Sequence, residues 1–306
     1  MEYLIHYFPI SGVKTYIFLP PLVMFIISSI VSMGGVSGAF ILLPFQVSIL
    51  GYTTPGVSAT NFIYNIVSIP SGIYKHIKKK QMCWSLFWII LAGTIPGIFI
   101  GYHIRVSYLP DPVRFKIFAG VVLGLLGLRT IQSSFNNDVK KRNLEVSILR
   151  EKIGFFRSEI YVTGLRYEFS TLFLGIVSFI VGIVGSIYGI GGGAILAPFC
   201  MSVLELPVYL VSGAALFSTW INSILGACIY AAMSYKTGVN AYPDWQLGLL
   251  FGIGGLIGIY VGSSFQRHVP EKIIKFILGI ILLFISARYL SSNLALSHFC
   301  LSYRDN

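Results

Sequence analysis

The sequence predicts an all-α, polytopic helical membrane protein with about eight spans, assembled from two similar halves. Of the 306 residues, 55% are hydrophobic and 11% are charged, whereas about a quarter of the residues in a soluble domain are charged. Long uncharged runs, such as residues 170–204, exceed the roughly 20 residues that a helix needs to cross the hydrocarbon layer. The second half of the chain also matches the first at an offset of 154 positions.

Hydropathy predicts the individual spans and two shorter apolar helices. The shorter ones, near residues 38–50 and 192–204, each follow a glycine cluster and are too short to cross the membrane alone. This combination indicates broken or re-entrant half helices. The expected spans lie near residues 16–33, 56–74, 84–104, 113–134, 169–188, 208–234, 242–264 and 270–291.

The repeat divides the chain into three parts. Residues 25–72 share 14 identities with their 48 counterparts, where this composition would give roughly one in ten by chance. A polar segment with seven basic and five acidic residues separates the halves. We therefore expect a first transmembrane repeat at 1–134, a cytoplasmic linker with some helix at 135–168, and a second transmembrane repeat at 169–306.

The relative orientation of the halves depends on whether the two short helices count as crossings. Without them each half crosses the membrane four times and the repeats are parallel; with them each half crosses five times and the repeats are inverted. The positive-inside rule allows both arrangements. The loop after the second span carries Lys75, Lys78, Lys79 and Lys80, whereas its counterpart carries only Lys236. This difference favours inverted repeats.

The two glycine clusters are the sharpest candidates for a functional site. Glycine permits backbone conformations that are closed to other residues, and uncovered amide groups are costly in lipid. A helix that begins at such a cluster points its positive dipole end and free N–H groups into the protein, where they can bind an anion. Close packing of helices through small residues is the alternative. The first cluster contains Gly34, Gly35, Ser37 and Gly38 and precedes Pro44, and the second contains Gly189, Gly191, Gly192 and Gly193 and precedes Pro198.

A stripe of polar side chains follows each cluster. Its members recur at steps of three and four residues, which places them on one helix face. Neutral hydrogen-bonding groups at membrane depth fit a substrate path without fixed charge, and hydrogen bonding between packed helices is the alternative. The stripe comprises Ser58, Asn61, Asn65, Ser68 and Gly72 in the first half and the equivalent positions Ser212, Ala215, Thr219, Asn222 and Gly226 in the second. The candidate substrate contacts among them are Ser58, Asn61, Asn65, Ser212, Thr219 and Asn222.

Charged residues argue against several other classes of protein. The 22 basic residues lie almost wholly between apolar runs, which indicates membrane topology and lipid contact and gives no nucleic-acid interface. The cysteines have no metal or disulfide spacing, and we predict no metal, cofactor or catalytic residue. Acidic residues fall in termini and loops, with Glu205 the one near a predicted core. A proton relay is therefore not expected, and passive anion flow or sodium coupling stays open.

Two readings other than transport remain. Residues 35–38 match a G-x-S-G nucleophile pattern, which would suggest an intramembrane serine protease. That chemistry needs a base beside the serine, and no histidine is expected at that depth. The other alternative is a membrane assembly factor or sensor without transport activity, because no feature of the sequence by itself demonstrates transport.

The second cluster resembles the signature of a known family. The run Gly189-Ile190-Gly191-Gly192-Gly193-Ala194-Ile195-Leu196-Ala197-Pro198 is similar to the G-x-G-G-G-x-x-x-x-P motif of the sulfite exporter TauE/SafE family. A degenerate copy runs from Gly34 to Pro44, with Ser37 and Ala39 where glycines would be expected. The likeness extends to the S-A-T-N and S-G-A-A segments that follow each short helix.

This resemblance implies transport of sulfur-containing anions, such as sulfite or sulfoacetate, with export as the expected direction. A carrier of another small metabolite on the same scaffold is the alternative. The expected partners are the small anionic substrate and the lipid bilayer, and a homodimer stays open. We expect a multi-pass protein of the cell (cytoplasmic) membrane.

Overall fold

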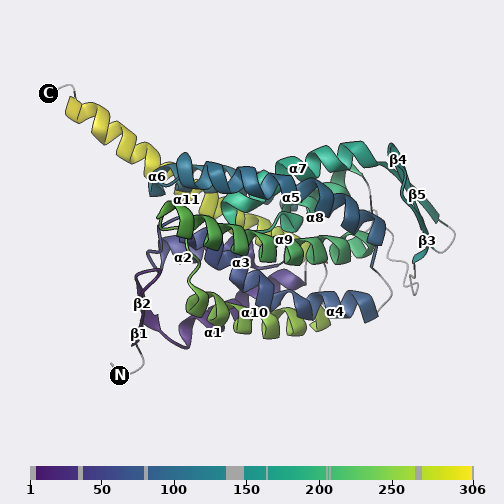
Figure 1. Ribbon diagram of the computed structural model, residues 1–306, viewed down its shortest axis with the longest axis horizontal. Coiled ribbons are helices and arrows are strands. Elements are labelled where there is room, and N and C mark those ends of the chain that lie inside the picture. Colours follow the sequence, from purple (N-terminus) through teal and green to yellow (C-terminus); the bar gives the residue numbers. More distant parts are fainter. Residues whose placement is uncertain are drawn as a thin grey trace.

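The computed structural model is a helical bundle with two small antiparallel sheets at its ends (Figure 1). It describes residues 5–33, 37–78, 82–135, 148–162, 165–204, 206, 208–265 and 271–304. The all-helical membrane architecture is confirmed, with the two sheets as additions. The elements within these ranges are β1 (Ile5–Phe8), β2 (Val13–Tyr16), α1 (Leu19–Ser32), α2 (Ala39–Ser48), α3 (Gly56–Ser68), α4 (Pro70–Lys78), α5 (Trp84–Ser107), α6 (Pro112–Phe135), β3 (Ile148–Lys152), β4 (Arg157–Val162), β5 (Leu165–Ser170), α7 (Thr171–Tyr188), α8 (Gly193–Val203), α9 (Val208–Thr237), α10 (Trp245–Phe265) and α11 (Glu271–Arg304).

Five of the described helices are long and apolar enough to cross a membrane, by length and composition. Three further apolar helices are shorter, and one of these is α2, as expected for a half helix. The exact number of crossings stays a prediction. The five long segments are Trp84–Ser107, Pro112–Gln132, Thr171–Tyr188, Leu210–Thr237 and Trp245–Ser264, and the shorter ones are Leu19–Ser32, Ala39–Ser48 and Phe276–Ser291.

The expected single span at residues 56–74 is wrong in detail, because it forms two helices. α3 ends at Ser68 and α4 begins at Pro70. Proline has no backbone N–H and its ring clashes with the carbonyl four residues earlier, so it interrupts a helix.

The long helices pack as three close pairs: α1 with α10, α5 with α7, and α6 with α11. Glycines allow the backbones to approach. A Cβ atom added to Gly97 of α5 would lie 2.6 Å from the carbonyl oxygen of Phe179 in α7, and one added to Gly258 of α10 would lie 2.6 Å from that of Phe25 in α1. Gly97 and Gly258 therefore have the same packing role in two different helix pairs.

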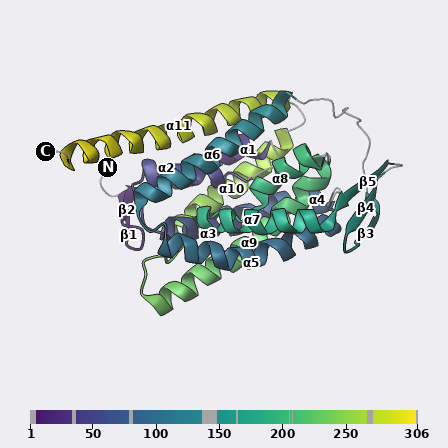
Figure 2. The ribbon, with the colours of Figure 1, turned by 90° about the horizontal axis from the view of Figure 1, so that it is seen from above.

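The pair α1 and α10 runs in the opposite direction to the pair α5 and α7. α1 and α10 begin beside the β1–β2 hairpin, where the Ser11 N–H donates to the Asp244 carboxylate at 3.1 Å. α5 and α7 begin beside the β3–β5 sheet, where the Trp84 N–H donates to Glu151 at 3.2 Å. The hairpin and the sheet lie at opposite ends of the bundle (Figures 1 and 2). α1 and its counterpart α7 are therefore antiparallel, which is the arrangement that inverted repeats would have; the repeat itself stays a prediction.

The central segment corrects the expectation of a linker with some helix. Its described part, residues 148–162 and 165–168, forms strands β3, β4 and most of β5, with the order β3-β4-β5. Along β4, buried Ser158, Ile160 and Val162 alternate with Arg157, Glu159 and Tyr161. This period of two residues is the pattern of a half-buried strand. The described part of the segment is therefore a sheet and not the helix that we expected.

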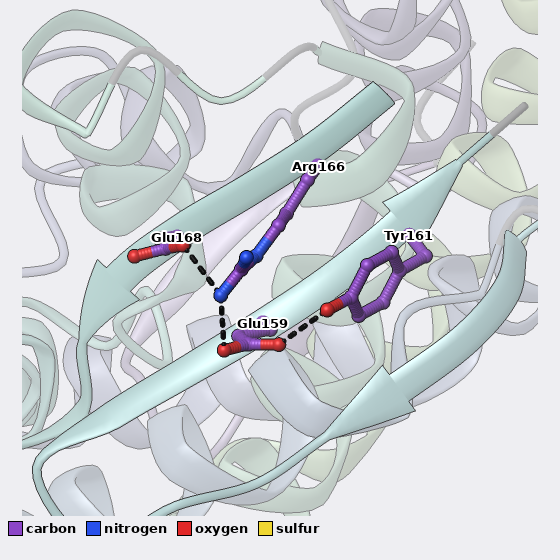
Figure 3. A network of polar contacts seen from close by, with 4 residues as sticks. All are labelled: Glu159, Tyr161, Arg166 and Glu168. Carbon is purple, nitrogen blue, oxygen red and sulfur yellow. Dashed lines mark hydrogen bonds and ion pairs between the residues drawn. The ribbon is translucent and has the colours of Figure 1, made fainter. Parts of the chain in front are cut away.

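A polar network holds the outer face of this sheet (Figure 3). Glu159 lies directly opposite Glu168 in the register of β4 and β5, and facing like charges destabilise a sheet. Arg166 removes this repulsion, because its guanidinium contacts Glu159 at 2.6 Å and Glu168 at 2.7 Å. The Tyr161 hydroxyl donates to Glu159 at 2.6 Å. Together, the hydrogen bonds from Tyr161 and Arg166 lower the pKa of Glu159.

The backbone contact between α5 and α7 gives a stability prediction. Gly97→Ala should lower the free energy of unfolding by about 2 kcal/mol, because the added methyl group overpacks a backbone interface. Gly175→Ala on the partner helix is the matched control, since no atom lies within 4 Å of the added Cβ. That control should change the free energy by less than about 0.5 kcal/mol. Thermal unfolding in detergent measures both, and equal shifts would contradict the packing argument.

Candidate functional site

The second glycine cluster forms a break between α7 and α8. Gly189 ends α7 with φ +82°, Gly191 has φ +75°, and Gly192 precedes α8 with φ +83°. Residues with side chains rarely adopt these left-handed conformations. Gly193 is the first residue of α8, and a Cβ on it would clash with the carbonyl oxygen of Ala215 in α9. The motif is therefore needed both for backbone conformation and for close approach to α9.

The first cluster forms the break before α2. Gly34 and Gly35 lie outside the described residues. Ser37 is buried, and Gly38 is the N-cap of α2 with φ −73°. The Gly38 N–H donates to the Tyr64 hydroxyl at 3.2 Å. The two breaks therefore differ: the counterpart of Gly38, Gly192, is left-handed, whereas Gly38 is not.

The predicted stripe on α3 contacts both breaks. The Asn61 amide donates to the carbonyl of Ala39, the first residue of α2, at 3.0 Å. The Asn65 amide donates to the Ile190 carbonyl at 3.3 Å, between the glycines of the second break. The Ser58 hydroxyl donates to the carbonyl of Ile187 at 2.7 Å. All three side chains are fully buried, so one helix face ties the two breaks together.

The stripe on α9 contacts the second break. The Asn222 amide donates to the Gly191 carbonyl at 3.1 Å and to the Thr94 hydroxyl of α5 at 2.7 Å. The Thr219 hydroxyl donates to Ala215 in its own helix at 2.7 Å, and its methyl group faces Gly191. Ser212 is buried, about two turns before Thr219. The structure thus brings Thr219 and Asn222 to the break, and Ser212 lies at a distance along the helix.

The two prolines lie inside the short helices. Pro44 cannot donate a backbone hydrogen bond to Phe40, and the Tyr188 hydroxyl instead donates to the Phe40 carbonyl at 2.9 Å. Tyr188 directly precedes Gly189, so Pro44 creates a link between α2 and the second break. The sequence pattern around Pro44 gives no signal of this link. Pro198 lies within α8, and its side chain is outside the described part of the chain.

A groove of about 620 Å³ lies against α2 and is lined by Pro44, Ser48, Lys116, Arg288 and Tyr289, among other residues. The Tyr289 hydroxyl contacts the Ser48 hydroxyl at 2.8 Å. Lys116 and Arg288 make this groove positively charged, next to one of the two short helices.

Several polar groups around the breaks have unused hydrogen-bonding capacity. Within the described residues, buried atoms without a hydrogen-bond partner include Ser37 Oγ, Asn65 Oδ1, Asn222 Oδ1 and Ser223 Oγ. Neither α2 nor α8 has a side-chain hydrogen bond at its N-cap. Buried polar groups usually have a partner, so these groups could bind a polar ligand or water. Within the described residues, the Ser37 hydroxyl has no hydrogen bond to a base of the kind that a nucleophilic serine needs.

Two buried charges were missed by the sequence analysis. Arg105 in the last turn of α5 and Asp244 just before α10 are 0% and 1% exposed. The expectation that acidic side chains avoid the core is thus wrong for Asp244; Glu205 lies outside the described residues. Arg105 follows Gly101 by four residues and so shares the face that packs inward, a signal that the sequence does carry. Among the described residues, no group of three or more His, Cys, Asp or Glu side chains could hold a metal ion.

The chain is similar to one known protein family and to several probable membrane transporters. The profile described as "Sulfite exporter TauE/SafE" matches residues 21–289. "Probable membrane transporter protein YunE" of Bacillus subtilis is 23% identical over 266 residues, which are 84% of this chain and 91% of that protein. A "Probable membrane transporter protein" of Xylella fastidiosa is 22% identical over 269 residues, 85% of this chain and 91% of that protein. No solved structure matches the chain significantly.

The second break gives a prediction with a matched control. Gly191→Ala should lower the free energy of unfolding by about 3 kcal/mol, because the left-handed backbone and a new Cβ contact of 2.9 Å with the Thr219 carbonyl both oppose it. Gly51→Ala has a similar φ of +71° but no atom within 4 Å of the Cβ. It should cost about 1 kcal/mol. Thermal unfolding of the purified variants measures the difference, and equal losses would show that only the backbone conformation matters at Gly191.

Proposed function

Because the chain belongs to the sulfite exporter TauE/SafE family, we propose that it exports small sulfur-containing anions, such as sulfite or sulfoacetate, across the cell membrane. The family, the names of its relatives and the long apolar helices identify the chain as a multi-pass membrane transporter. Its relatives are named as membrane transporters, which are not enzymes.

One observation carries the proposal of an anion as substrate: two glycine-led helix starts lie inside the bundle, without side-chain caps, and are held by one polar face of α3. A helix N-terminus has a partial positive charge and free N–H groups, which favour an anion. Broken helices with their N-termini at the substrate are a recurring design of secondary transporters. The proposal is supported by Asn61, Asn65 and Asn222, three predicted substrate-binding residues whose amides donate to the backbone at the two breaks.

The Asn222 contact with the second break supplies a test of this site. Asn222→Ala removes the donor to Gly191 and Thr94, so we expect the rate of sulfite efflux from proteoliposomes to fall about tenfold or more, as when a buried polar partner is lost. Ser218→Ala is the matched control, because the Ser218 hydroxyl donates to its own helix at Ala214 and lies off the stripe. It should retain efflux within about twofold.

The choice of anions separates the proposed function from its alternatives. The same vesicles should be loaded in turn with sulfite, sulfoacetate, taurine, sulfate and a neutral metabolite. Efflux of the sulfur oxyanions supports the proposal, and selective efflux of another compound would indicate a different carrier on this scaffold. No efflux of any compound by the folded protein would favour an assembly factor or sensor.

The membrane potential tests the direction and the coupling. A potential of 100 mV corresponds to about 2.3 kcal/mol per charge, or about a 50-fold concentration ratio for a monoanion. If flux is passive, an inside-negative potential set by potassium and valinomycin should drive net release of the monoanion, hydrogen sulfite, to that ratio. An unchanged final ratio would contradict passive flow of a single charge and would indicate electroneutral coupling.

A further inference from the structure

We propose that Arg105 is the positive charge that binds the transported anion, on the hairpin side of the second glycine break. The inference rests on the proposed function and adds a binding residue to it. Arg105 belongs to α5, which begins at the β3–β5 end of the bundle (Figure 1). Since Arg105 lies in the last turn of that helix, its place is toward the end that carries the β1–β2 hairpin.

The guanidinium of Arg105 is fully buried and has no carboxylate within 4.0 Å among the described residues. A buried charge without a counter-charge is costly. Asp244, the other buried charge that the structure describes, already uses its carboxylate oxygens to accept the N–H groups of Ser11 and Leu247, at 3.1 and 3.0 Å. Arg105 therefore lacks the anionic partner that its burial calls for.

The contacts of Arg105 orient the guanidinium and leave one of its terminal nitrogens without a partner. Its Nη1 donates to the Leu109 carbonyl, its Nε donates to the Ser58 hydroxyl at 3.4 Å, and its plane lies 3.7 Å from the ring centre of Phe115. The Nη2 atom has no hydrogen-bond partner. A guanidinium fixed on three sides with a free terminal nitrogen can donate to an oxyanion.

Ser58 connects Arg105 to the second break. The Ser58 hydroxyl that accepts from Arg105 donates in turn to the Ile187 carbonyl at 2.7 Å. Ile187 lies two residues before Gly189. In the same turn, Ser186 accepts a hydrogen bond from the Tyr230 hydroxyl at 3.0 Å. The buried charge is thus one side chain away from the backbone that leads into the break.

This arrangement specifies the class of ligand. The unpaired Nη2 carries two N–H groups on a fixed positive charge, which suit the oxygens of an oxyanion such as sulfite, a sulfonate or a carboxylate. The uncharged polar groups of α3 and α9 cannot discriminate an anion from a neutral solute by charge. Arg105 supplies that discrimination, so its loss should weaken binding of oxyanions specifically.

Thermal unfolding of the purified full-length protein, with increasing sulfite at constant ionic strength, tests the assignment, because a ligand that binds the folded state raises the unfolding temperature. The sulfite concentration for the half-maximal shift should rise about tenfold or more in Arg105→Gln, as when a hydrogen bond to a charged group is lost. In Arg105→Lys it should rise about threefold or more, because the charge is kept and the fork is lost. Arg114→Gln, an exposed cation on α6 with a side chain 71% accessible, is the matched control and should keep the wild-type midpoint.

A wild-type midpoint in Arg105→Gln would overturn the proposal. If Arg105→Gln does not fold, a wild-type midpoint in Arg105→Lys would overturn the proposal instead. Sulfite efflux from proteoliposomes then separates the binding role of Arg105 from the transport of sulfite. Binding that depends on Arg105 without efflux supports the binding residue and contradicts transport of sulfite, whereas efflux with a wild-type KM in the variant supports transport and contradicts the role of Arg105. Absence of both binding and efflux in the wild type overturns both.

Discussion

Backbone groups inside a membrane need hydrogen-bond partners within the protein, because lipid offers none. Two helices of this chain begin inside the bundle, so their flanking carbonyls and N–H groups lack the partners that a continuous helix would provide. Side chains replace them: Asn61 bonds to the start of α2, Asn65 to the second break and Asn222 to Gly191. This requirement fixes α3 and α9 beside the breaks and explains why these helices carry amides at membrane depth.

The surrounding helices constrain how the bundle could move. α3 and α9 pack on each other, and α3 also packs on α10 while α9 packs on α5. Outside them lie α1 and α7, which contact α10 and α5 backbone to backbone at Gly258 and Gly97. Each of these close pairs takes one helix from each half of the chain. Any displacement of one whole half against the other would open both interfaces, so movement that preserves them has to occur between the pairs and the central helices.

Local periodicity was enough to predict the parts of this structure that are set by sequence neighbours. The steps of three and four in Ser58, Asn61 and Asn65 correctly predicted a single polar face. The glycine motif predicted backbone conformations that are closed to other residues, and Gly191 adopts one with φ +75°. Contacts between distant segments could not be predicted in this way. The bond from Tyr188 to Phe40 spans 148 positions and depends on how the halves interlock.

The same distinction explains the errors. The strands around residues 148–170 are short and polar on one face. The alternation of buried and exposed residues along them was therefore a weaker signal than the polar composition of the segment. Arg105 ends an expected span, where a basic residue ordinarily extends its charged group to the membrane surface. The structure instead turns it inward, because Ser58 and Leu109 accept its N–H groups and Phe115 covers its plane.

The two breaks are unequal, although the sequences around them match at an offset of 154 positions. The second break consists of three left-handed glycines, and its carbonyls are occupied by Asn65 and Asn222. The first has a buried serine hydroxyl at Ser37 and a right-handed Gly38 whose N–H is occupied by Tyr64. The single buried cation, among the described residues, lies beside the second break only. Charge and hydrogen-bonding capacity are therefore distributed differently at the two breaks, although the backbone plan of a short, glycine-led helix is shared.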